Sequence, residues 1–181
     1  MISAALSILK SDTERKIVSE IYNANSKRFY SIAYSRLKNK TDSEDAVQEA
    51  FLRIATNPET FFKVPDNKKV AFIDVVVRNV AIEMFRKKTA VVEVEIEDDY
   101  TLDSCSIEDM VIGDISKEAL VDYIKSMPDT QKDVLLLRVY NNLSNKEIAQ
   151  MLNISETAAR KRISDALKMI RSFVNGENNN E

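Results

Sequence analysis

The sequence has very few of the residues that interrupt helices: only two of its 181 residues are glycine and three are proline. Glycine and proline are the least favourable residues in a helix interior, so their scarcity, together with 30% charged residues, predicts an all-α protein. Histidine is absent, and the one cysteine, Cys105, excludes an internal disulfide and fits a reducing compartment. Without histidine or a cysteine cluster we expect no metal site and no cofactor.

Long apolar runs are missing as well. The longest one, near the middle of the chain, is far shorter than the roughly 20 residues that cross a membrane, and no signal peptide is visible. The sequence contains no P-loop, no dinucleotide-binding fingerprint and no nucleophile motif. These absences predict a cytoplasmic protein without membrane insertion, and they leave no candidate catalytic residue.

The charge is unevenly distributed along the chain. Between Thr89 and Ser116 there are nine acidic residues and no basic one, and without them a net charge of −3 becomes +6 for the remainder. The chain therefore reads as two mildly basic blocks joined by an acidic connector. We expect the domains to span residues 1–88 and 116–174, with a linker at 89–115 and a disordered polar tail at 175–181.

The stretch from Leu143 to Phe173 carries the clearest functional signal. Ser144 and Glu147 form a capping-box pair that starts one helix. Asn153 tolerates the left-handed turn that must follow, and Ser155 is a suitable N-cap for a second helix. The buried face of the second helix follows from apolar residues at spacings of four, three and four: Ala159, Ile163, Ala166 and Ile170.

This pattern is that of a helix-turn-helix, whose second helix enters the major groove of DNA. From Ser155 to Val174 the sequence carries five basic and two acidic residues, a local net charge of +3. An ordinary helical hairpin with a solvated charged face would show the same periodicity. Two further helices, from about Ser116 to Ser126 and from Pro128 to Tyr140, are expected to complete a small bundle with it.

The N-terminal block is also predicted to be helical. Residues 1 to about 10 show no clear pattern, and Thr13 to Lys38 reads as one long helix or as two with a break near residues 23–26. Thr41 and Glu44 form a second capping-box signature, which opens a helix with an apolar face on one side. Its other face carries Glu44, Asp45, Gln48, Glu49 and Arg53, which periodicity alone assigns to solvent.

Residues 67–88 give two conflicting signals. Val75 to Val77 favour a strand, whereas Phe72, Val76, Val80 and Met84 recur every four residues over the whole window. The longer pattern favours one helix of about 20 residues. Its end is basic, which by itself suits the negative end of a helix dipole. Further on, Val91 to Ile96 alternates apolar and acidic residues, a weak strand signal.

Taken together, these segments resemble the bacterial extracytoplasmic-function (ECF) sigma factors, the small two-domain promoter-recognition subunits of RNA polymerase. DSEDAVQEAFLRIA, from Asp42 to Ala55, looks like the family's polymerase-binding helix. FIDVVVRNVAIEMFRKK, from Phe72 to Lys88, resembles its promoter-melting helix, and MPDTQKDVLLLRVYNNLSNKEIAQMLNIS resembles its C-terminal domain. The resemblance implies two small helical domains, the second a helix-turn-helix bundle, in a protein that is not itself an enzyme.

The resemblance also implies roles for particular residues. Core RNA polymerase would bind Glu44, Asp45, Gln48, Glu49 and Arg53. The minus-ten promoter DNA would contact Phe72, Arg78, Asn79, Arg86, Lys87 and Lys88, with the loop from Asn57 to Asn67 as a candidate base pocket. The minus-thirty-five element would be read by Ser155, Glu156, Thr157, Arg160, Lys161 and Ser164. An anti-sigma factor is a further implied partner, and the acidic connector is either a tether or a mimic of nucleic acid.

Some positions depart from the family pattern. The tryptophan that is common early in the melting helix is Phe72 here, so base stacking would fall to Phe72, Phe85 or a neighbour. A position that is usually basic in the recognition helix is Asp165. Two alternatives remain open at this point: another helix-turn-helix transcriptional regulator, or a degenerate sigma-like protein that acts only through protein interactions.

Overall fold

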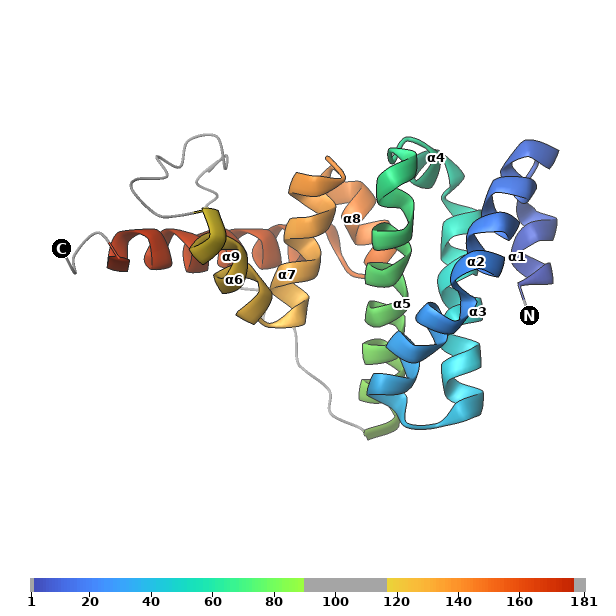
Figure 1. Ribbon diagram of the computed structural model, residues 1–181, viewed down its shortest axis with the longest axis horizontal. Coiled ribbons are helices and arrows are strands. Elements are labelled where there is room, and N and C mark those ends of the chain that lie inside the picture. Colours follow the sequence, from blue (N-terminus) through green and yellow to red (C-terminus); the bar gives the residue numbers. More distant parts are fainter. Residues whose placement is uncertain (1, 90–116, 178–181) are drawn as a thin grey trace. The chain divides into compact units, whose positions relative to one another are not determined.

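The computed structural model describes residues 2–89 and 117–177, and every regular element within these ranges is a helix (Figure 1). The all-α prediction is therefore confirmed. The chain forms two compact units: the first contains α1 to α5, and the second contains α6, α7, η2, α9 and most of α8. The predicted linker begins one residue too early, because Thr89 still belongs to the last helix of the first unit. The rest of the linker, the strand signal at 91–96 and Cys105 lie outside the described residues.

The first unit is built from helices α1 (Ser3–Ile8), α2 (Asp12–Leu37), α3 (Lys40–Thr56), α4 (Pro58–Phe62) and α5 (Asp66–Thr89). The short helix α1 was missing from the sequence-based prediction. It packs on α3 and buries Ile2, Ala5 and Leu9, which lie at spacings of three and four. A single turn and a half offers too little periodicity to stand out in the sequence, so only the tertiary contact reveals it.

Helix α2 runs without a break through residues 23–26. Ser11 starts it with a complete capping box in which the Glu14 side chain accepts from the Ser11 backbone amide. At the other end Lys38 adopts a left-handed conformation (φ 53°), and its amide donates to the Tyr34 carbonyl. The sharp turn that follows places α3 beside α2.

The predicted capping box of Thr41 and Glu44 is wrong. Helix α3 begins at Lys40, and its N-cap is Asn39, whose side-chain oxygen accepts from the Asp42 amide at 3.0 Å. The left-handed turn at Lys38 leaves Asn39 extended, the backbone conformation that an N-cap needs. Thr41 is therefore already inside the helix and cannot cap it.

Helices α2, α3 and α5 enclose the core of the first unit. The predicted apolar face of α3 is buried, and its Phe51 ring meets Tyr22 and Phe29 of α2 edge-on, with centroids 5.3 and 5.6 Å apart. Val75 to Val77 lie in the middle of α5 and are fully buried. The helical interpretation of this stretch is thus confirmed. A helix that is apolar all round is buried, and tertiary packing overrides the weak helix propensity of β-branched residues.

An ion pair with one buried partner also joins α2 to α5. The Asp74 carboxylate accepts from Arg28 Nε at 3.0 Å with each oxygen and from Arg28 Nη2 at 2.5 Å. The Asp74 side chain is 8% exposed, whereas that of Arg28 is 60% exposed. This hydrogen bonding, and the negative charge of Asp74, raise the pKa of Arg28.

The second unit contains α6 (Lys117–Ser126), α7 (Asp129–Leu135), the π-helical segment η2 (Leu136–Tyr140), α8 (Asn145–Leu152) and α9 (Glu156–Glu177). The helix predicted from Pro128 to Tyr140 thus widens over its last five residues. The wide turn is closed by the Asn141 amide, which donates to the Leu136 carbonyl at 3.0 Å. It buries Leu137 and leaves Val139 and Tyr140 exposed.

Helix α9 packs on α7 and α6. Ala159, Ile163, Ala166 and Ile170 are buried as predicted. The Phe173 ring stacks on Tyr123 of α6 with centroids 4.1 Å apart, and the Tyr123 hydroxyl donates to the Met169 carbonyl. The helix continues to Glu177, so the prediction of a disordered tail from residue 175 is wrong for residues 175–177. Residues 178–181 lie outside the described part of the chain.

Candidate functional site

The helix-turn-helix has the predicted local geometry. The Glu147 side chain accepts from the Ser144 amide at 2.7 Å, and the Ser144 hydroxyl accepts from the Glu147 amide at 3.3 Å. Asn153 is left-handed (φ 52°), and the Ser155 hydroxyl accepts from the Ala158 amide at 3.0 Å. These bonds set the start of α9 firmly, as a helix that enters a groove by its N-terminal end requires.

The side chains predicted to read DNA lie on the face of α9 away from its core. Ser155, Glu156 and Thr157 are exposed, whereas Arg160, Lys161 and Ser164 are half-buried. Arg160 Nη2 pairs with the Glu156 carboxylate at 3.0 Å along the helix. Arg160 Nε is buried and has no hydrogen-bond partner within the described part of the chain. The pair holds the guanidinium of Arg160 beside Glu156 on the first turns of α9.

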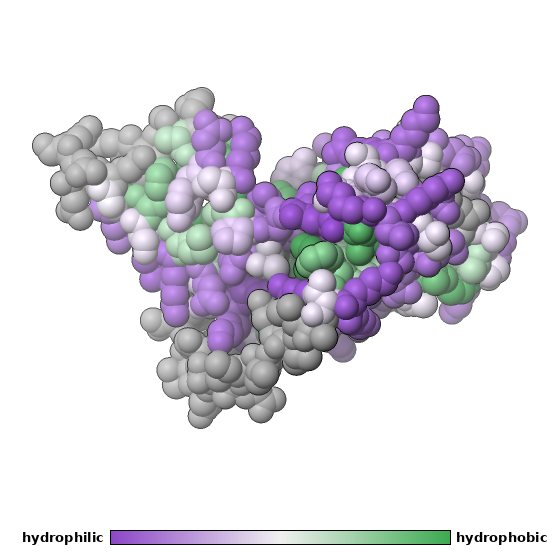
Figure 2. Space-filling model, turned by 90° about the horizontal axis from the view of Figure 1, so that it is seen from below, coloured by the Kyte–Doolittle hydropathy of each residue, from purple (hydrophilic) through white to green (hydrophobic). Residues whose placement is uncertain are grey.

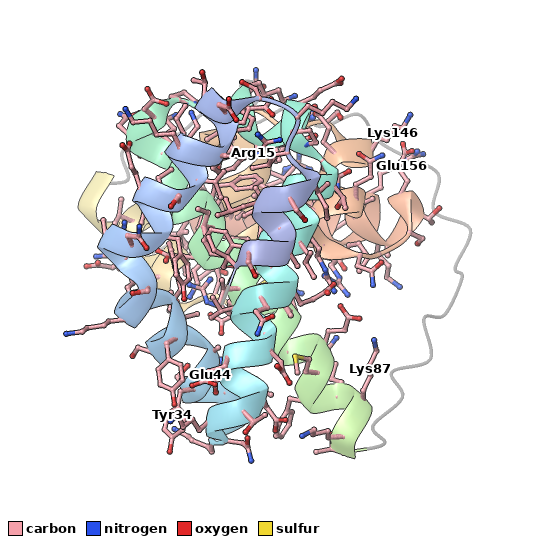
Figure 3. All side chains as sticks on the ribbon, turned by 90° about the vertical axis from the view of Figure 1, so that its right-hand side faces the viewer. Arg15, Tyr34, Glu44, Lys87, Lys146 and Glu156 are labelled. Atoms are coloured by element: carbon pink, nitrogen blue, oxygen red, sulfur yellow. The ribbon has the colours of Figure 1, made fainter. Side chains whose placement is uncertain are left out.

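The predicted polymerase-binding face of α3 is acidic at its N-terminal half. Asp45 is exposed, and Glu44, Gln48 and Glu49 are half-buried. Glu44 lies at the end of the unit where α2 turns into α3, close to Tyr34 of α2 (Figure 3). Burial, and then the negative charge of Glu44, raise the pKa of Tyr22 on the neighbouring helix.

Arg53, the fifth residue predicted on this face, points inward instead. Its side chain is only 11% exposed, and it donates to Glu49 at 3.0 Å and to Glu83 of α5 at 2.7 Å. Burial opposes ionisation of Glu83, but hydrogen bonds from Lys87 and Arg53 lower its pKa below the ordinary carboxyl value. Arg53 therefore ties α3 to α5, and its contribution to a partner surface is small.

The basic end of α5 is partly neutralised within the unit. Lys87 donates to Glu83 at 2.7 Å, and Lys88 donates to Asp42 of α3 at 2.5 Å. Lys87 stands at the end of α5 in Figure 3. Both lysines are exposed, with side chains 73% and 59% accessible, so these ion pairs contribute little to stability. Each lysine can therefore exchange its carboxylate partner for a phosphate.

The earlier part of α5 is less accessible than predicted. Arg78 is half-buried. Asn79 is 8% exposed, and its side-chain amide donates to the Val75 carbonyl at 3.0 Å. The Phe72 ring is fully buried against Phe61, at 5.8 Å between centroids. Phe72 thus has no surface on which a base could stack in this structure. The exposed aromatic residue of α5 is Phe85, at 50%.

The loop from residue 57 to 67 is more ordered than a plain loop, because it contains α4. Phe61 is fully buried, whereas Phe62 is half-buried and meets it edge-on at 5.1 Å. The Lys69 ammonium, 5% exposed, donates to the Val64 carbonyl at 2.8 Å and to Asp66. Of the two phenylalanines proposed for a base pocket, only Phe62 reaches the surface.

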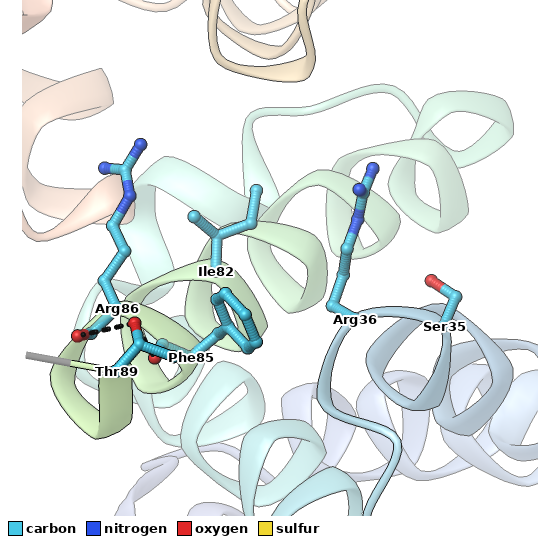
Figure 4. Close-up of a pocket in the computed structure, with 6 residues that line it drawn as sticks. All are labelled: Ser35, Arg36, Ile82, Phe85, Arg86 and Thr89. Carbon is cyan, nitrogen blue, oxygen red and sulfur yellow. Dashed lines mark hydrogen bonds between the residues drawn. The ribbon is translucent and has the colours of Figure 1, made fainter. Parts of the chain in front are cut away.

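A feature that sequence reasoning missed lies between the last turns of α2 and α5. Ser35 and Arg36 of α2 face four residues of α5 across a pocket of about 390 Å³: Ile82, Phe85, Arg86 and Thr89. Figure 4 shows the two arginines on either side of Ile82 and Phe85. The family resemblance points to Phe85 and Arg86, but nothing in the sequence indicates that the end of α2 meets them.

Two family models match this chain. The one described as "Sigma-70 region 2" matches residues 21–91, and the one described as "Sigma-70, region 4" matches residues 117–170. They cover both helical units in the order that the sequence predicted. The chain belongs to the sigma-70 family, among the ECF sigma factors. The region 2 match accounts for the N-terminal unit, which a different helix-turn-helix regulator would leave unexplained.

Individual relatives agree with this assignment. "RNA polymerase sigma factor SigV" of Bacillus subtilis is 28% identical over 164 residues, covering 90% of this chain and 93% of the relative. "ECF RNA polymerase sigma factor SigM" of the same organism is 28% identical over 167 residues, covering 91% and 99%. "ECF RNA polymerase sigma factor SigW" is 25% identical over 164 residues, covering 84% and 86%. The ECF resemblance is therefore confirmed along nearly the whole length.

None of the described helices is both long enough and apolar enough to span a bilayer. No group of three or more histidine, cysteine, aspartate or glutamate side chains in residues 2–89 and 117–177 is placed to hold a metal ion.

Proposed function

We propose that this ECF sigma factor binds core RNA polymerase through the acidic face of α3 and brings it to a promoter through α5 and α9. The observation that carries the proposal is the presence of both sigma regions in one chain, each with its characteristic helix in place. The polymerase supplies the chemistry, and this chain supplies specificity from the cytoplasm.

Within this proposal α9 reads the minus-thirty-five element. Its exposed N-terminal turn and the Glu156–Arg160 pair offer one acceptor and one planar donor to base edges. In the major groove arginine favours guanine and glutamate favours cytosine. Asp165, half-buried further along α9, reduces the number of phosphates that the helix can neutralise.

The minus-ten region falls to the end of α5. Lys87, Lys88 and Arg86 supply cations for phosphates, and Phe85 supplies the exposed ring. Arg78 and Asn79 belong to the same helix, where Asn79 needs a change of rotamer to reach a base. Phe72 supports this helix from the core and makes no direct contact in the proposal.

Run-off transcription tests the proposal. Purified chain added to core polymerase is expected to direct transcripts from promoters found by sequencing the RNAs that its overexpression raises. A chain that binds polymerase but never supports run-off would be a degenerate regulator instead. A chain that does not bind core polymerase at all would refute the proposal.

Charge reversal separates the two surfaces. Glu44→Lys with Asp45→Lys is expected to abolish polymerase binding, whereas Glu20→Lys, on an exposed site of α2, is expected to leave it unchanged. Arg160→Glu with Lys161→Glu is expected to abolish run-off but to retain polymerase binding. Lys125→Glu, 70% exposed on α6, is the matched control for charge in the second unit.

The isolated chain is expected to bind promoter duplex weakly, because its net charge is −3 and affinity grows with the number of phosphates neutralised. Tight, sequence-specific binding in a mobility-shift assay at physiological salt, without polymerase, would contradict this. An anti-sigma factor that covers the α3 and α9 surfaces completes the proposal, and it would compete with both polymerase and DNA.

A further inference from the structure

A row of ion pairs runs from the predicted polymerase-binding face of α3 to the basic end of α5. Arg53 Nε donates to the Glu49 carboxylate at 3.0 Å, and Arg53 Nη2 donates to one Glu83 oxygen at 2.7 Å. Lys87 Nζ donates to the other Glu83 oxygen, also at 2.7 Å. Neighbours in the row are thus in direct contact, and a change of partner at one end can reach the other end.

The two ends of this row are accessible and its middle is not. The Glu49 side chain is 45% exposed and that of Lys87 is well exposed, whereas the Arg53 and Glu83 side chains are 11% and 23% exposed. Figure 2 looks onto the end of the first unit where α5 finishes and shows hydrophilic side chains around a small apolar area. A protein partner can therefore reach Glu49, and a phosphate can reach Lys87, without displacing the two residues between them.

Arg53 divides its donors between two carboxylates. Its Nη1 is buried and has no hydrogen-bond partner within residues 2–89 and 117–177. A guanidinium pairs best with one carboxylate, through two parallel hydrogen bonds. If a cation of a partner takes Glu49, Arg53 Nε is released and can join Nη2 on Glu83. The new bond falls on the oxygen that Lys87 holds, so it weakens the Glu83–Lys87 pair.

We infer that Glu83 is a positioning residue that couples polymerase binding to DNA binding. In the free chain Glu83 holds Lys87, and when polymerase engages Glu49 it pairs with Arg53 instead and releases Lys87 to a phosphate. The inference rests on the proposed function, which places one surface on α3 and the other on α5. Exposed ion pairs are weak, so the expected coupling is about threefold. By linkage, DNA at Lys87 strengthens polymerase binding at Glu49 by the same factor.

Two simpler effects would involve the same residues. The row could only tie α3 to α5, in which case loss of Glu83 lowers stability and weakens every binding reaction. Removal of an acid could also strengthen DNA binding through the general field of the protein, whether or not Lys87 is present. A double-mutant cycle distinguishes coupling from both effects, because only a residue that acts through Lys87 loses its influence in a Lys87 variant.

Binding of single-stranded DNA tests one direction of the coupling. The full chain is titrated against a labelled oligothymidine of about twelve nucleotides, and fluorescence anisotropy at low salt gives the affinity. Glu83→Gln and Glu49→Gln are each expected to raise the affinity about threefold, and the double variant no further, because the same lysine is released. Neither should change the affinity of Lys87→Gln. Glu20→Gln, at an exposed position of α2, removes the same charge and should have no effect.

Binding of core polymerase tests the other direction, with the opposite sign. In Glu83→Gln, Arg53 pairs with Glu49 alone, so the affinity for polymerase should fall about threefold while the affinity for DNA rises. In Lys87→Gln, Glu83 is left to Arg53, so the affinity for polymerase should rise about threefold, and it should not rise when Glu83→Gln is also present. A folding defect would lower both affinities, and thermal unfolding of each variant checks for one.

Three results would overturn the coupling: a gain in DNA affinity from Glu83→Gln that persists in Lys87→Gln, additive gains from Glu83→Gln and Glu49→Gln, or a polymerase affinity that Glu83→Gln leaves unchanged. Absence of oligothymidine binding by every variant would also overturn it, because no substitution would then have exposed a lysine to DNA. If run-off transcription succeeds while any of these occurs, only the coupling is rejected. If the chain fails to bind core polymerase at all, the proposed function is rejected with it.

Discussion

The Arg28–Asp74 pair provides the sharpest test of how the first unit is held together. Arg28→Met keeps an unbranched aliphatic stem, although a shorter one, and removes all three hydrogen bonds to the carboxylate. The Asp74 side chain, 8% exposed, would then be a charge without its cation in the core between α2 and α5. We expect this single change to destabilise the unit more than any other substitution of an exposed α2 side chain.

The size of the expected loss in stability follows from the exposed fractions of the Arg28 and Asp74 side chains. Breaking a fully buried ion pair costs roughly 3–5 kcal/mol, but the Arg28 side chain is 60% exposed, so water can approach the carboxylate once the guanidinium is gone. Hydrogen bonds to a charged group contribute roughly 1.5–3 kcal/mol. We therefore expect Arg28→Met to lower the free energy of unfolding by about 2 kcal/mol, and the melting temperature of a unit of this size by about 10 °C.

A double-mutant cycle isolates the pair. Asp74→Asn removes the negative charge of the pair. In that background Arg28→Met should therefore lower the free energy of unfolding much less, which corresponds to a coupling free energy of about 1–2 kcal/mol. Urea unfolding followed by circular dichroism gives the free energies, and hydrogen exchange of the α2 and α5 amides assigns the loss to the first unit. Lys27→Met, an exposed neighbour of equal charge, should lie within about 0.5 kcal/mol of the unmodified chain. A loss below about 0.5 kcal/mol for Arg28→Met, or additive effects, would refute the reasoning.

Three further predictions concern single contacts. Burial opposes ionisation of Glu83, yet its hydrogen bonds lower its pKa. The stability that Glu83 provides is therefore present above the ordinary carboxyl pKa of about 4.5 and is lost as the pH falls below it. The free energy of unfolding of Glu83→Gln, measured against pH, should lack this loss at acid pH. Lys69→Met should leave the Val64 carbonyl without its partner and cost about 1–3 kcal/mol in urea unfolding, with a smaller effect counting against a buried role. Asn39→Ala should lower the free energy of unfolding by about 1 kcal/mol and Thr41→Ala should hardly change it. The opposite order would support the capping box expected from the sequence.

The helices of both units followed from local patterns. The spacing of apolar residues in α3 and α9 and the caps at Ser144 and Ser155 act over three or four residues, so the sequence displays them directly. Short-range signals fail where two of them overlap. Asn39 and Thr41 are both good caps, and only the left-handed turn at Lys38 decides between them.

The candidate surfaces were predicted less completely. Exposure of Asp45, Glu156 and Thr157 agrees with the helical pattern, since each lies opposite an apolar face. Arg53 lies on the polar side of its helix but is turned inward, because its partner Glu83 comes from another helix. Phe72 belongs to the apolar stripe of α5 and is buried against Phe61, so the DNA contact implied for it by the family resemblance has no exposed surface. The spacing of residues along one helix carries no information about which residue of another helix they contact.

The sequence by itself determined which segments are helices, which face of each is apolar, and which family the order of those segments resembles, because these properties depend on neighbours within a turn or two. Only the tertiary structure decided that Arg28 meets Asp74, 46 positions away, and that Arg36 joins Phe85 in a pocket. The reason is physical: the angle at which two helices pack depends on the fit of many side chains at once, and it sets which distant residues face each other.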